Sequence, residues 1–249
     1  MPDLEQWVLH RLKELDVVMR ESTEAFDFHR MYVELHQFCS VDLSAFYFDI
    51  RKDSLYCDRP DDPRRRAVRT VMDIVFDSLA KWLAPILCFT AEEAWLARHG
   101  DAPDVSVHLQ VFPILPDAWV APDLAQRWST LRDLRRVVTG AIELERAAKR
   151  IGSSLQASVV LYADAAVESA LAGHDLAEIC IVSEAVLSLE AAPEGAFTMA
   201  DVPGIAVTVG LASGEKCQRC WRVLPEVTTI AAHPDLCGRC ADAVDHIHK

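Results

Sequence analysis

The chain has 249 residues, of which 51% are hydrophobic, and a formal net charge of −13 at pH 7. This length is enough for two domains and a small extra module, and the composition is typical of a globular protein. No apolar run approaches the roughly 20 residues that a membrane-spanning helix needs, and the first five residues lack the basic and apolar segments of a signal peptide. We therefore expect a cytoplasmic protein that does not enter the membrane.

The negative charge is concentrated in one part of the chain. Residues 151 to 215 contain nine acidic residues and no Lys or Arg, so this stretch carries −9 of the −13. The remainder is close to balanced and contains local basic clusters. Because phosphate contacts depend on local positive charge, the acidic total does not exclude a nucleic-acid partner.

The first half of the chain predicts a bundle of helices. Residues 4 to 19 repeat apolar side chains every three or four positions, as an amphipathic helix does, and a second such series runs from Phe28 to Cys39. Ser40 or Asp42 is expected to cap a further helical turn.

Prolines predict the limits of the next helices. Asp62-Pro63 is typical of a helix start and predicts a long helix from Arg64 to Leu83, which Ala84-Pro85 would end. Thr90-Ala91-Glu92-Glu93 matches a capping box and predicts a short helix that begins there. The proline-rich segment from Gly100 to Pro122 is expected to be a connection.

A further helix is predicted over residues 123 to 150. Its expected apolar stripe consists of Leu134, Val137, Ala141, Leu144 and Ala148. Basic residues lie off this stripe and would form a basic flank: Arg135, Arg136, Arg146, Lys149 and Arg150. The flank is either a phosphate-binding surface or simply a solvated face.

Beyond Gly152 the pattern changes to short runs rich in β-branched residues. These runs cover residues 159–162, 179–182, 185–189 and 205–209, and we expect each to be a strand. They predict a small α+β domain after the helices.

Two Cys-x-x-Cys sequences near the end of the chain predict a metal site. The first contains Cys217 and Cys220, and the second, after sixteen intervening residues, contains Cys237 and Cys240. Four thiolates are a typical tetrahedral ligand set for one Zn²⁺ ion, and they leave no position for water or substrate, so the zinc is expected to be structural. A redox function would instead predict a single such pair within a βαβ unit.

The other cysteines and the nearby histidines are not expected to join this site. His233 lies between the two pairs, but four thiolates already complete the coordination. His246 and His248 are expected to lie in a frayed end. The remaining cysteines are in apolar contexts and are interpreted as reduced core residues: Cys39, Cys57, Cys88 and Cys180.

Residues around the metal site suggest a nucleic-acid contact. Trp221 directly follows a ligand, and four cations lie close to the site in sequence: Lys216, Arg219, Arg222 and Arg239. A rigid indole among cations suits stacking on an unpaired base, which contributes about 1–3 kcal/mol per base. The alternative is a Trp that covers the metal site among solvated basic neighbours.

No catalytic motif is visible in the sequence. It contains no Gly-x-Gly-x-x-Gly, no Walker loop, no Gly-x-Ser-x-Gly and no His-Glu-x-x-His, and the zinc deaminase pattern is also missing. The sequence therefore predicts a binding protein more readily than an enzyme.

Four motifs, in order along the chain, resemble the carboxy-terminal part of bacterial-type isoleucyl-tRNA synthetases. They are Phe38–Ser44 with Phe46–Tyr47 and Lys52–Tyr56, Trp82–Leu87 with Phe89–Glu93, Ile151–Ala157, and Lys216–Trp221. The resemblance implies a mainly α fold, with a helical anticodon-binding domain over residues 1–120, a helix and small α+β junction domain over 121–212, and a four-cysteine zinc ribbon over 213–249. It also implies isoleucine tRNA as the partner and a role for Trp221 in reading the first anticodon base.

The resemblance stops short of the catalytic parts of that family. Neither His-Ile-Gly-His nor Lys-Met-Ser-Lys-Ser occurs, and no editing domain is recognisable, so ATP and isoleucine have no expected site here. We expect a monomeric part of a longer ligase that binds tRNA for a catalytic domain outside this sequence and is inactive alone.

Two other interpretations stay open from the sequence. Formamidopyrimidine-type DNA glycosylases also end in a four-cysteine finger, and their N-terminus is similar to Met1-Pro2-Asp3-Leu4, but they need a Glu after the proline, a β-sandwich and usually a basic surface. The third possibility is a helical scaffold with a structural zinc and no nucleic-acid partner.

Overall fold

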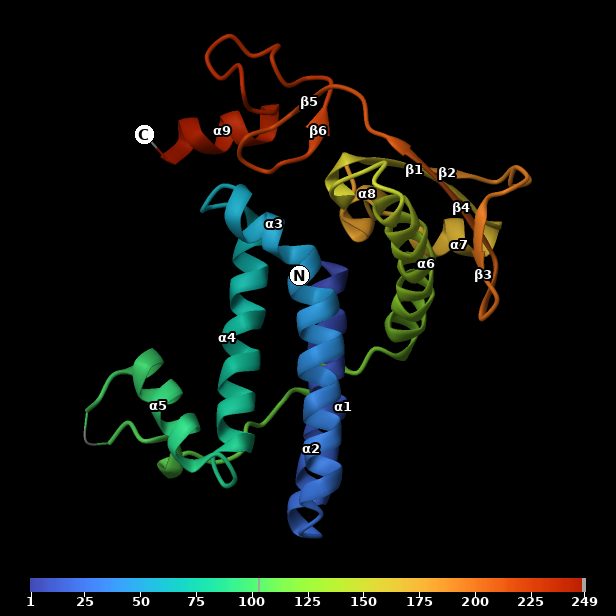
Figure 1. Ribbon diagram of the computed structural model, residues 1–249. Coiled ribbons are helices and arrows are strands. Elements are labelled where there is room, and N and C mark those ends of the chain that lie inside the picture. The colour runs from blue at the N-terminus through green and yellow to red at the C-terminus, as the bar shows by residue number, and fades with distance from the viewer. Residues whose placement is uncertain (103, 248–249) are drawn as a thin grey trace. The chain divides into compact units, whose positions relative to one another are not determined.

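The computed structural model describes residues 1–102 and 104–247, and it divides the chain into two compact units (Figure 1). The first unit contains residues 1–49 and 63–122, and the second contains residues 50–62 and everything from Asp123 on. A short segment of the first half of the sequence thus belongs with the C-terminal part. Pro103 of the expected connection and His248 of the expected frayed end lie outside the described residues.

In the first unit, the helices α1 (Asp3–Glu24) and α2 (Phe28–Gln37) form an antiparallel pair joined by a short turn. The predicted stripe of α1 is buried, including Trp7, Val8 and Leu12. Asp27 caps α2 by accepting a hydrogen bond from the backbone N–H of Arg30 at 3.0 Å. The periodicity therefore predicted both helices correctly.

The helical backbone continues without a break through Phe38–Phe48, which is a π-helix (η1). The predicted cap at Ser40 or Asp42 is wrong, because both side chains have other partners. The Ser40 hydroxyl donates to the carbonyl of His36, and the Asp42 carboxylate accepts a hydrogen bond from Arg11 Nε at 3.2 Å. Bonds of this kind leave the backbone helical.

The next two helices are α4 (Pro63–Leu83) and α5 (Cys88–His99). The predicted proline limits of α4 are confirmed, but α5 begins two residues before the expected capping box and has no side-chain cap. Thr90 therefore lies inside the helix and is not its N-cap. The carboxylate of Glu92 accepts hydrogen bonds from Ser106 Oγ at 3.0 Å and from the Val107 backbone N–H at 2.8 Å, so it fixes the following connection to the helix.

The expected connection is present as a largely irregular segment. Within it lie two short 3-10 turns, Val107–Leu109 (η2) and Asp117–Trp119 (η3). Lys13 Nζ on α1 donates to the carbonyl of Leu115 at 3.0 Å, so part of the connection is fixed along the first helix.

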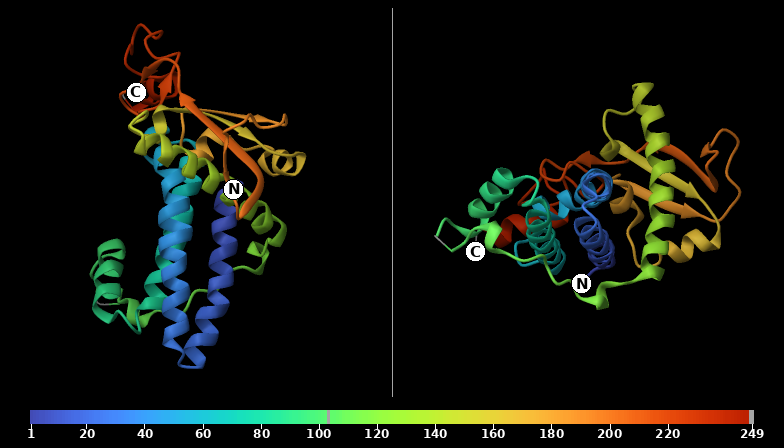
Figure 2. Two further views of the ribbon diagram at one scale, coloured as in Figure 1. Left: turned by 45° about the vertical axis from the view of Figure 1, so that its right-hand side comes forward. Right: turned by 90° about the horizontal axis from the view of Figure 1, so that it is seen from below.

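The second unit is built around the long helix α6 (Pro122–Ala147) and a four-stranded sheet (Figure 2). The predicted stripe of α6 is buried through Leu134, Val137 and Ala141, but Leu144 and Ala148 are exposed. The prediction was wrong for these two, because Leu144 lies in an exposed last turn and Ala148 follows the end of the helix at Ala147.

The sheet has the order β2-β1-β4-β3, with β1 (Ala157–Tyr162) parallel to β2 (Glu184–Ser188) and antiparallel to β4 (Val202–Leu211), which also pairs with β3 (Phe197–Met199). The helices α7 (Ala165–Leu171) and α8 (Leu176–Cys180) connect β1 to β2. A strand was expected over residues 179–182, but Ile179 and Cys180 end α8, and Ile181 follows the helix in a left-handed conformation. The side chain of Asp175 caps the start of α8. A short apolar run does not reveal its period.

The chain ends in a small module with the two-stranded sheet β5 (Glu215–Lys216) and β6 (Val223–Leu224), followed by α9 (Gly238–Ile247). The segment 50–62, which contains most of α3 (Asp49–Cys57), belongs to the same compact unit. Among the described helices, none is both long and apolar enough to cross a membrane.

Candidate metal centre and nucleic-acid interface

The four predicted cysteine ligands form one cluster in the terminal module. The sulfur atoms of Cys217, Cys220, Cys237 and Cys240 lie within 4.8 Å of one another, and all four residues are buried. The Cys220 and Cys237 sulfurs are 3.8 Å apart. A tetrahedral zinc ion with Zn–S bonds of about 2.3 Å requires sulfur atoms about 3.8 Å apart, so the cluster has the right size.

The backbone around the cluster is arranged for thiolate ligands. The Cys237 backbone N–H donates to the Cys217 sulfur at 3.3 Å. The two Cys-x-x-Cys segments, Cys217–Cys220 and Cys237–Cys240, are called the first and second hook. The first hook is closed by hydrogen bonds from Trp221 N–H to the Cys217 carbonyl and from Cys217 N–H to the Arg222 carbonyl, both at 2.9 Å. N–H donors near sulfur stabilise negative charge there.

The thiols of this cluster need a cation in order to ionise together. The hydrogen bond with Cys237 and burial raise the pKa of the Cys220 thiol to about 11, because a second negative sulfur at this distance is unfavourable. A divalent cation removes this penalty by binding all four thiolates. The buried set of four soft donors therefore fits one structural zinc ion, with no coordination position left for a substrate.

An apolar shell closes the metal centre. Val227, Leu236 and Ala241 of the module are buried against the four ligands, and Cys57 of α3 joins the same cluster with 4% of its surface exposed. His233 is not a ligand, since its Nε2 pairs with Asp245 at 2.9 Å. His246 lies in α9 and pairs with Asp61 at 3.5 Å, so the expectation of a frayed end was wrong for this residue.

Trp221 is held at the surface of the metal module. Its backbone adopts a positive φ of 67°, which the closed first hook imposes, and 60% of its surface is exposed. The ammonium group of Lys216 lies 5.4 Å from the centre of the ring, within the range of a cation–π contact. The indole therefore does not cover the metal site but presents its ring to solvent beside a cation.

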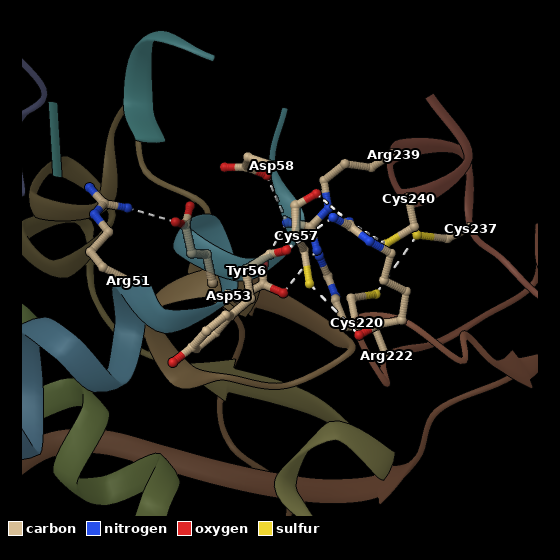
Figure 3. Close-up of polar contacts among 12 residues, drawn as sticks. Arg51, Asp53, Tyr56, Cys57, Asp58, Cys220, Arg222, Cys237, Arg239 and Cys240 are labelled. Carbon is tan, nitrogen blue, oxygen red and sulfur yellow. Dashed lines mark hydrogen bonds and ion pairs between the residues drawn. The ribbon is translucent and has the colours of Figure 1, made fainter. Parts of the chain in front are cut away.

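The three arginines of the metal module that were predicted to touch RNA are engaged within the protein. Arg239 binds Asp53 through two hydrogen bonds, one of them 2.9 Å long, and Asp58 at 3.2 Å (Figure 3). Arg219 donates to the backbone carbonyls of α3, and Arg222 donates to the Ser183 carbonyl at 2.8 Å. Their RNA contacts stay a prediction, and the geometry favours an internal role for all three.

Asp53 and Asp58, which were not predicted, are partners of the metal module. Asp58 is 3% exposed, and burial of a carboxylate is unfavourable without a cation. Burial by itself raises the pKa of the Asp53 carboxyl, but the hydrogen bonds and charge of Arg239 outweigh it and lower that pKa below its ordinary value. The one signal in the sequence was the presence of two acids, Asp53 and Asp58, close to Cys57, which could have indicated a binding partner for the distant arginines.

The predicted basic flank of α6 is split in the structure. Arg146, Lys149 and Arg150 border a hollow of about 560 Å³ at the end of the helix. Arg135, in contrast, is half-buried. Its positive charge acts to lower the pKa of the Cys180 thiol, although burial raises that pKa by more. Arg146 pairs with Glu143 at 2.6 Å and Arg150 pairs with Glu145 at 2.7 Å, so acids balance much of this positive charge.

The segment after the hollow has a defined local structure. The side chain of Gln156 accepts hydrogen bonds from the backbone N–H groups of Gly152 at 2.6 Å and Ser153 at 3.3 Å. Together with Ser153 this forms a capping box at the turn Ser154–Gln156 (η4), which leads into β1. The turn fixes the chain at the edge of the hollow.

The four cysteines outside the metal centre were expected in the core. Cys57 and Cys180 are buried, but Cys39 is half-buried and Cys88 is exposed, so the expectation was wrong for these two. None of the eight cysteines, all of which lie in the described part of the chain, forms a disulfide bond.

Comparison with known families defines the class of this protein. Residues 5–161 match the model "Anticodon-binding domain of tRNA ligase", and residues 214–243 match "Zinc finger found in FPG and IleRS". The second description covers both DNA glycosylases and synthetases, but the first match and the helix at Asp3–Glu24 do not favour a glycosylase. The class is therefore defined by two parts found in tRNA ligases, an anticodon-binding domain and a zinc finger.

Curated relatives give the particular family. The chain is 52% identical over 243 residues to an isoleucine–tRNA ligase of Mesorhizobium japonicum, covering 96% of this chain and 24% of the relative. The isoleucine–tRNA ligases of Brucella abortus and Ruegeria pomeroyi are 50% and 48% identical over 98% of this chain and 25% of their own length. The chain belongs to the isoleucine–tRNA ligase family, and it spans about a quarter of the length of these relatives.

Proposed function

We propose that this chain binds the anticodon stem-loop of isoleucine tRNA and holds the tRNA for ATP-dependent aminoacylation. The observation that carries the proposal is the exposed ring of Trp221, fixed by a closed thiolate cage beside Lys216. Aminoacylation itself would take place at a catalytic domain, because the sequence contains neither catalytic motif of class I synthetases. We propose the cytoplasm as the setting and a monomer as the acting form.

The physical basis is the match between the metal module and an unpaired nucleotide. Anticodon bases are unstacked and exposed, and RNA-binding proteins recognise such bases by stacking them on aromatic side chains. The zinc ligands hold the backbone on one side of Trp221, so little conformational entropy is lost when a base stacks on it. Lys216 beside the ring adds positive charge next to the sugar–phosphate backbone.

A second contact is proposed at the hollow bordered by Arg146, Lys149 and Arg150. Lys149 has a positive φ of 58°, and it is exposed at the point where α6 ends. Phosphates of the anticodon stem are the suitable ligands for these cations. Since Arg146 and Arg150 are already paired with acids, the hollow is expected to contribute less than Trp221 to the free energy of binding.

Replacing Trp221 tests the proposal. Trp221→Ala should weaken binding of an isoleucine anticodon stem-loop by roughly 5- to 150-fold, the equivalent of one lost base stack, while zinc content stays at one ion per chain. Trp221→Phe should retain much of the affinity because it keeps an aromatic plate. The measurement is a titration of labelled stem-loop at one stated salt concentration, with a stem-loop of altered anticodon as the control.

Two results would count against the proposal. One is equal affinity of the unchanged protein and Trp221→Ala for the isoleucine stem-loop. The other is equal affinity of the unchanged protein for the matched and the altered anticodon, which would indicate phosphate binding without recognition.

A further inference from the structure

Both metal hooks carry an arginine at the same position. The sequences are Cys217-Gln218-Arg219-Cys220 and Cys237-Gly238-Arg239-Cys240, so each arginine directly precedes the second ligand of its hook. When zinc holds the cysteines on both sides, the backbone of the arginine is fixed as well. The two guanidinium groups are the "hook arginines", Arg219 and Arg239, and both are directed to α3.

Arg239 holds the acidic side of α3 and of the residue after it. It forms a two-pronged pair with Asp53 and a third bond to Asp58, whose side chain is 2% exposed. Two-pronged pairs between guanidinium and carboxylate fix orientation as well as distance. The exposed ion pairs of the same region, such as Arg59 with Asp242 at 3.5 Å, contribute little by comparison.

Arg219 holds the end of α3. It donates to the carbonyl of Tyr56 at 3.0 Å and to the carbonyl of Cys57, the last residue of the helix. Carbonyls in the last turn of a helix have no partner within the helix, and a cation there is favourable for the helix dipole. In return, the Cys57 thiol contacts the Arg219 carbonyl at 3.8 Å.

The segment fastened in this way carries an exposed aromatic ring. Tyr56 is 78% exposed although its own carbonyl is bound by Arg219. Figure 3 shows its ring pointing away from the cysteine cluster, on the outside of α3. A tyrosine exposed to this extent gains little from burial, so its position is not explained by packing. The exposed ring of Trp221 follows Arg219 by two residues.

We propose that the hook arginines are positioning residues that fasten α3 to the zinc centre, and that they place Tyr56 as a second aromatic contact for the anticodon loop beside Trp221. One metal ion then fixes two stacking surfaces, the ring of Trp221 and the ring of Tyr56. The part of this inference that concerns RNA rests on the proposed function, whereas the fastening of α3 concerns the protein alone.

Hydrogen exchange measured by mass spectrometry on the full chain tests the fastening. Arg219→Gln and Arg239→Gln should each increase exchange in the peptide that covers residues 50–62, with one zinc ion per chain retained. Arg136→Gln is the matched control, because Arg136 is an exposed arginine of the same unit paired with Asp133 and Asp201. This variant should leave the exchange of the peptide over residues 50–62 unchanged.

Arg219→Gln is the decisive variant if Arg239→Gln fails to fold, since it leaves the Asp53 and Asp58 pairs intact. Unchanged exchange in Arg219→Gln would overturn the proposal.

Affinity for the anticodon stem-loop tests the second contact. Tyr56→Ala should weaken binding by roughly 5- to 150-fold. Tyr56→Phe should keep the affinity of the unchanged protein, because stacking needs only the ring. Arg219→Gln should weaken binding with zinc content unchanged. Leu211→Ala, which shortens another exposed apolar side chain of the unit, is the control and should have no effect. Equal affinity of Tyr56→Ala and the unchanged protein would overturn the RNA contact. Failure of the unchanged protein to bind would overturn the proposed function and the Tyr56 contact together, while the exchange result decides the fastening separately.

Discussion

At the scale of single residues, the cysteines show how context decides the role of one side chain. Four of them share a buried cluster and act as a metal site, whereas Cys180 is isolated in the core and Cys88 is exposed. Burial raises the pKa of the Cys180 thiol to about 12, so this thiol is neutral at physiological pH. The sequence context of all four remaining cysteines is apolar, which is why sequence analysis could not separate Cys88 from the buried ones.

This difference predicts the order of thiol alkylation. With zinc bound, iodoacetamide at pH 8 should modify Cys88 first and leave Cys180 unmodified until the protein unfolds, because the thiolate is the reactive form. Peptide mass spectrometry over time measures both sites in one sample. Modification of Cys180 at a rate similar to Cys88 would contradict the structure of the core around α8.

A single glycine is also expected to be essential for the metal module. Gly214 has a φ of +106°, and a Cβ atom there would lie 2.3 Å from the Leu224 backbone carbon. Gly214→Ala should therefore destabilise the folded state by about 2 kcal/mol or more and displace the β5–β6 pair. Gly210→Ala, where the nearest atom is 4.0 Å away and φ is not in the positive range, is the control. Thermal unfolding of both variants with zinc bound measures the effect, and equal midpoints would refute it.

At the scale of elements, amphipathic periods predicted α1, α2 and α6, since a long stripe of buried residues leaves little ambiguity. The prolines at 63 and 85 predicted the limits of α4. Short elements were less predictable. A strand was expected over residues 179–182, but Ile179 and Cys180 end α8, and the expected capping box at Thr90–Glu93 lies inside α5, which begins at Cys88. A short run of residues fits more than one element, so its local pattern does not fix where a helix begins or ends.

The candidate site was likewise predictable from the sequence only in part. The spacing of the cysteines predicted the metal ligands, because four thiols at that spacing have few other uses. Spacing gave no indication that Arg219 and Arg239 are directed to α3, more than 150 residues earlier in the chain. Charge near a metal site suggested RNA, whereas the acids of α3 supply a partner inside the protein.

At the scale of the whole molecule, zinc is expected to organise more than its own module. Structural zinc contributes on the order of 10 kcal/mol to the folding of small metal modules. Because α3 shares a buried cluster with the ligands, removal of the metal should release residues 50–62 as well as residues 214–247. Cys217→Ser or an excess of chelator should increase hydrogen exchange in both segments, while α1 stays protected. Retained protection of the terminal module without metal would contradict a structural role for zinc.

The central claim is that the thiolate cage fixes Trp221 for stacking on an anticodon base. Its most direct test is the affinity for the isoleucine anticodon stem-loop of four samples, namely the unchanged protein and Trp221→Ala, each with zinc bound and after chelation. We expect Trp221→Ala to weaken binding by roughly 5- to 150-fold with zinc bound, and to have no further effect once zinc is removed. An equal effect of the substitution with and without zinc would show that the metal does not position the ring.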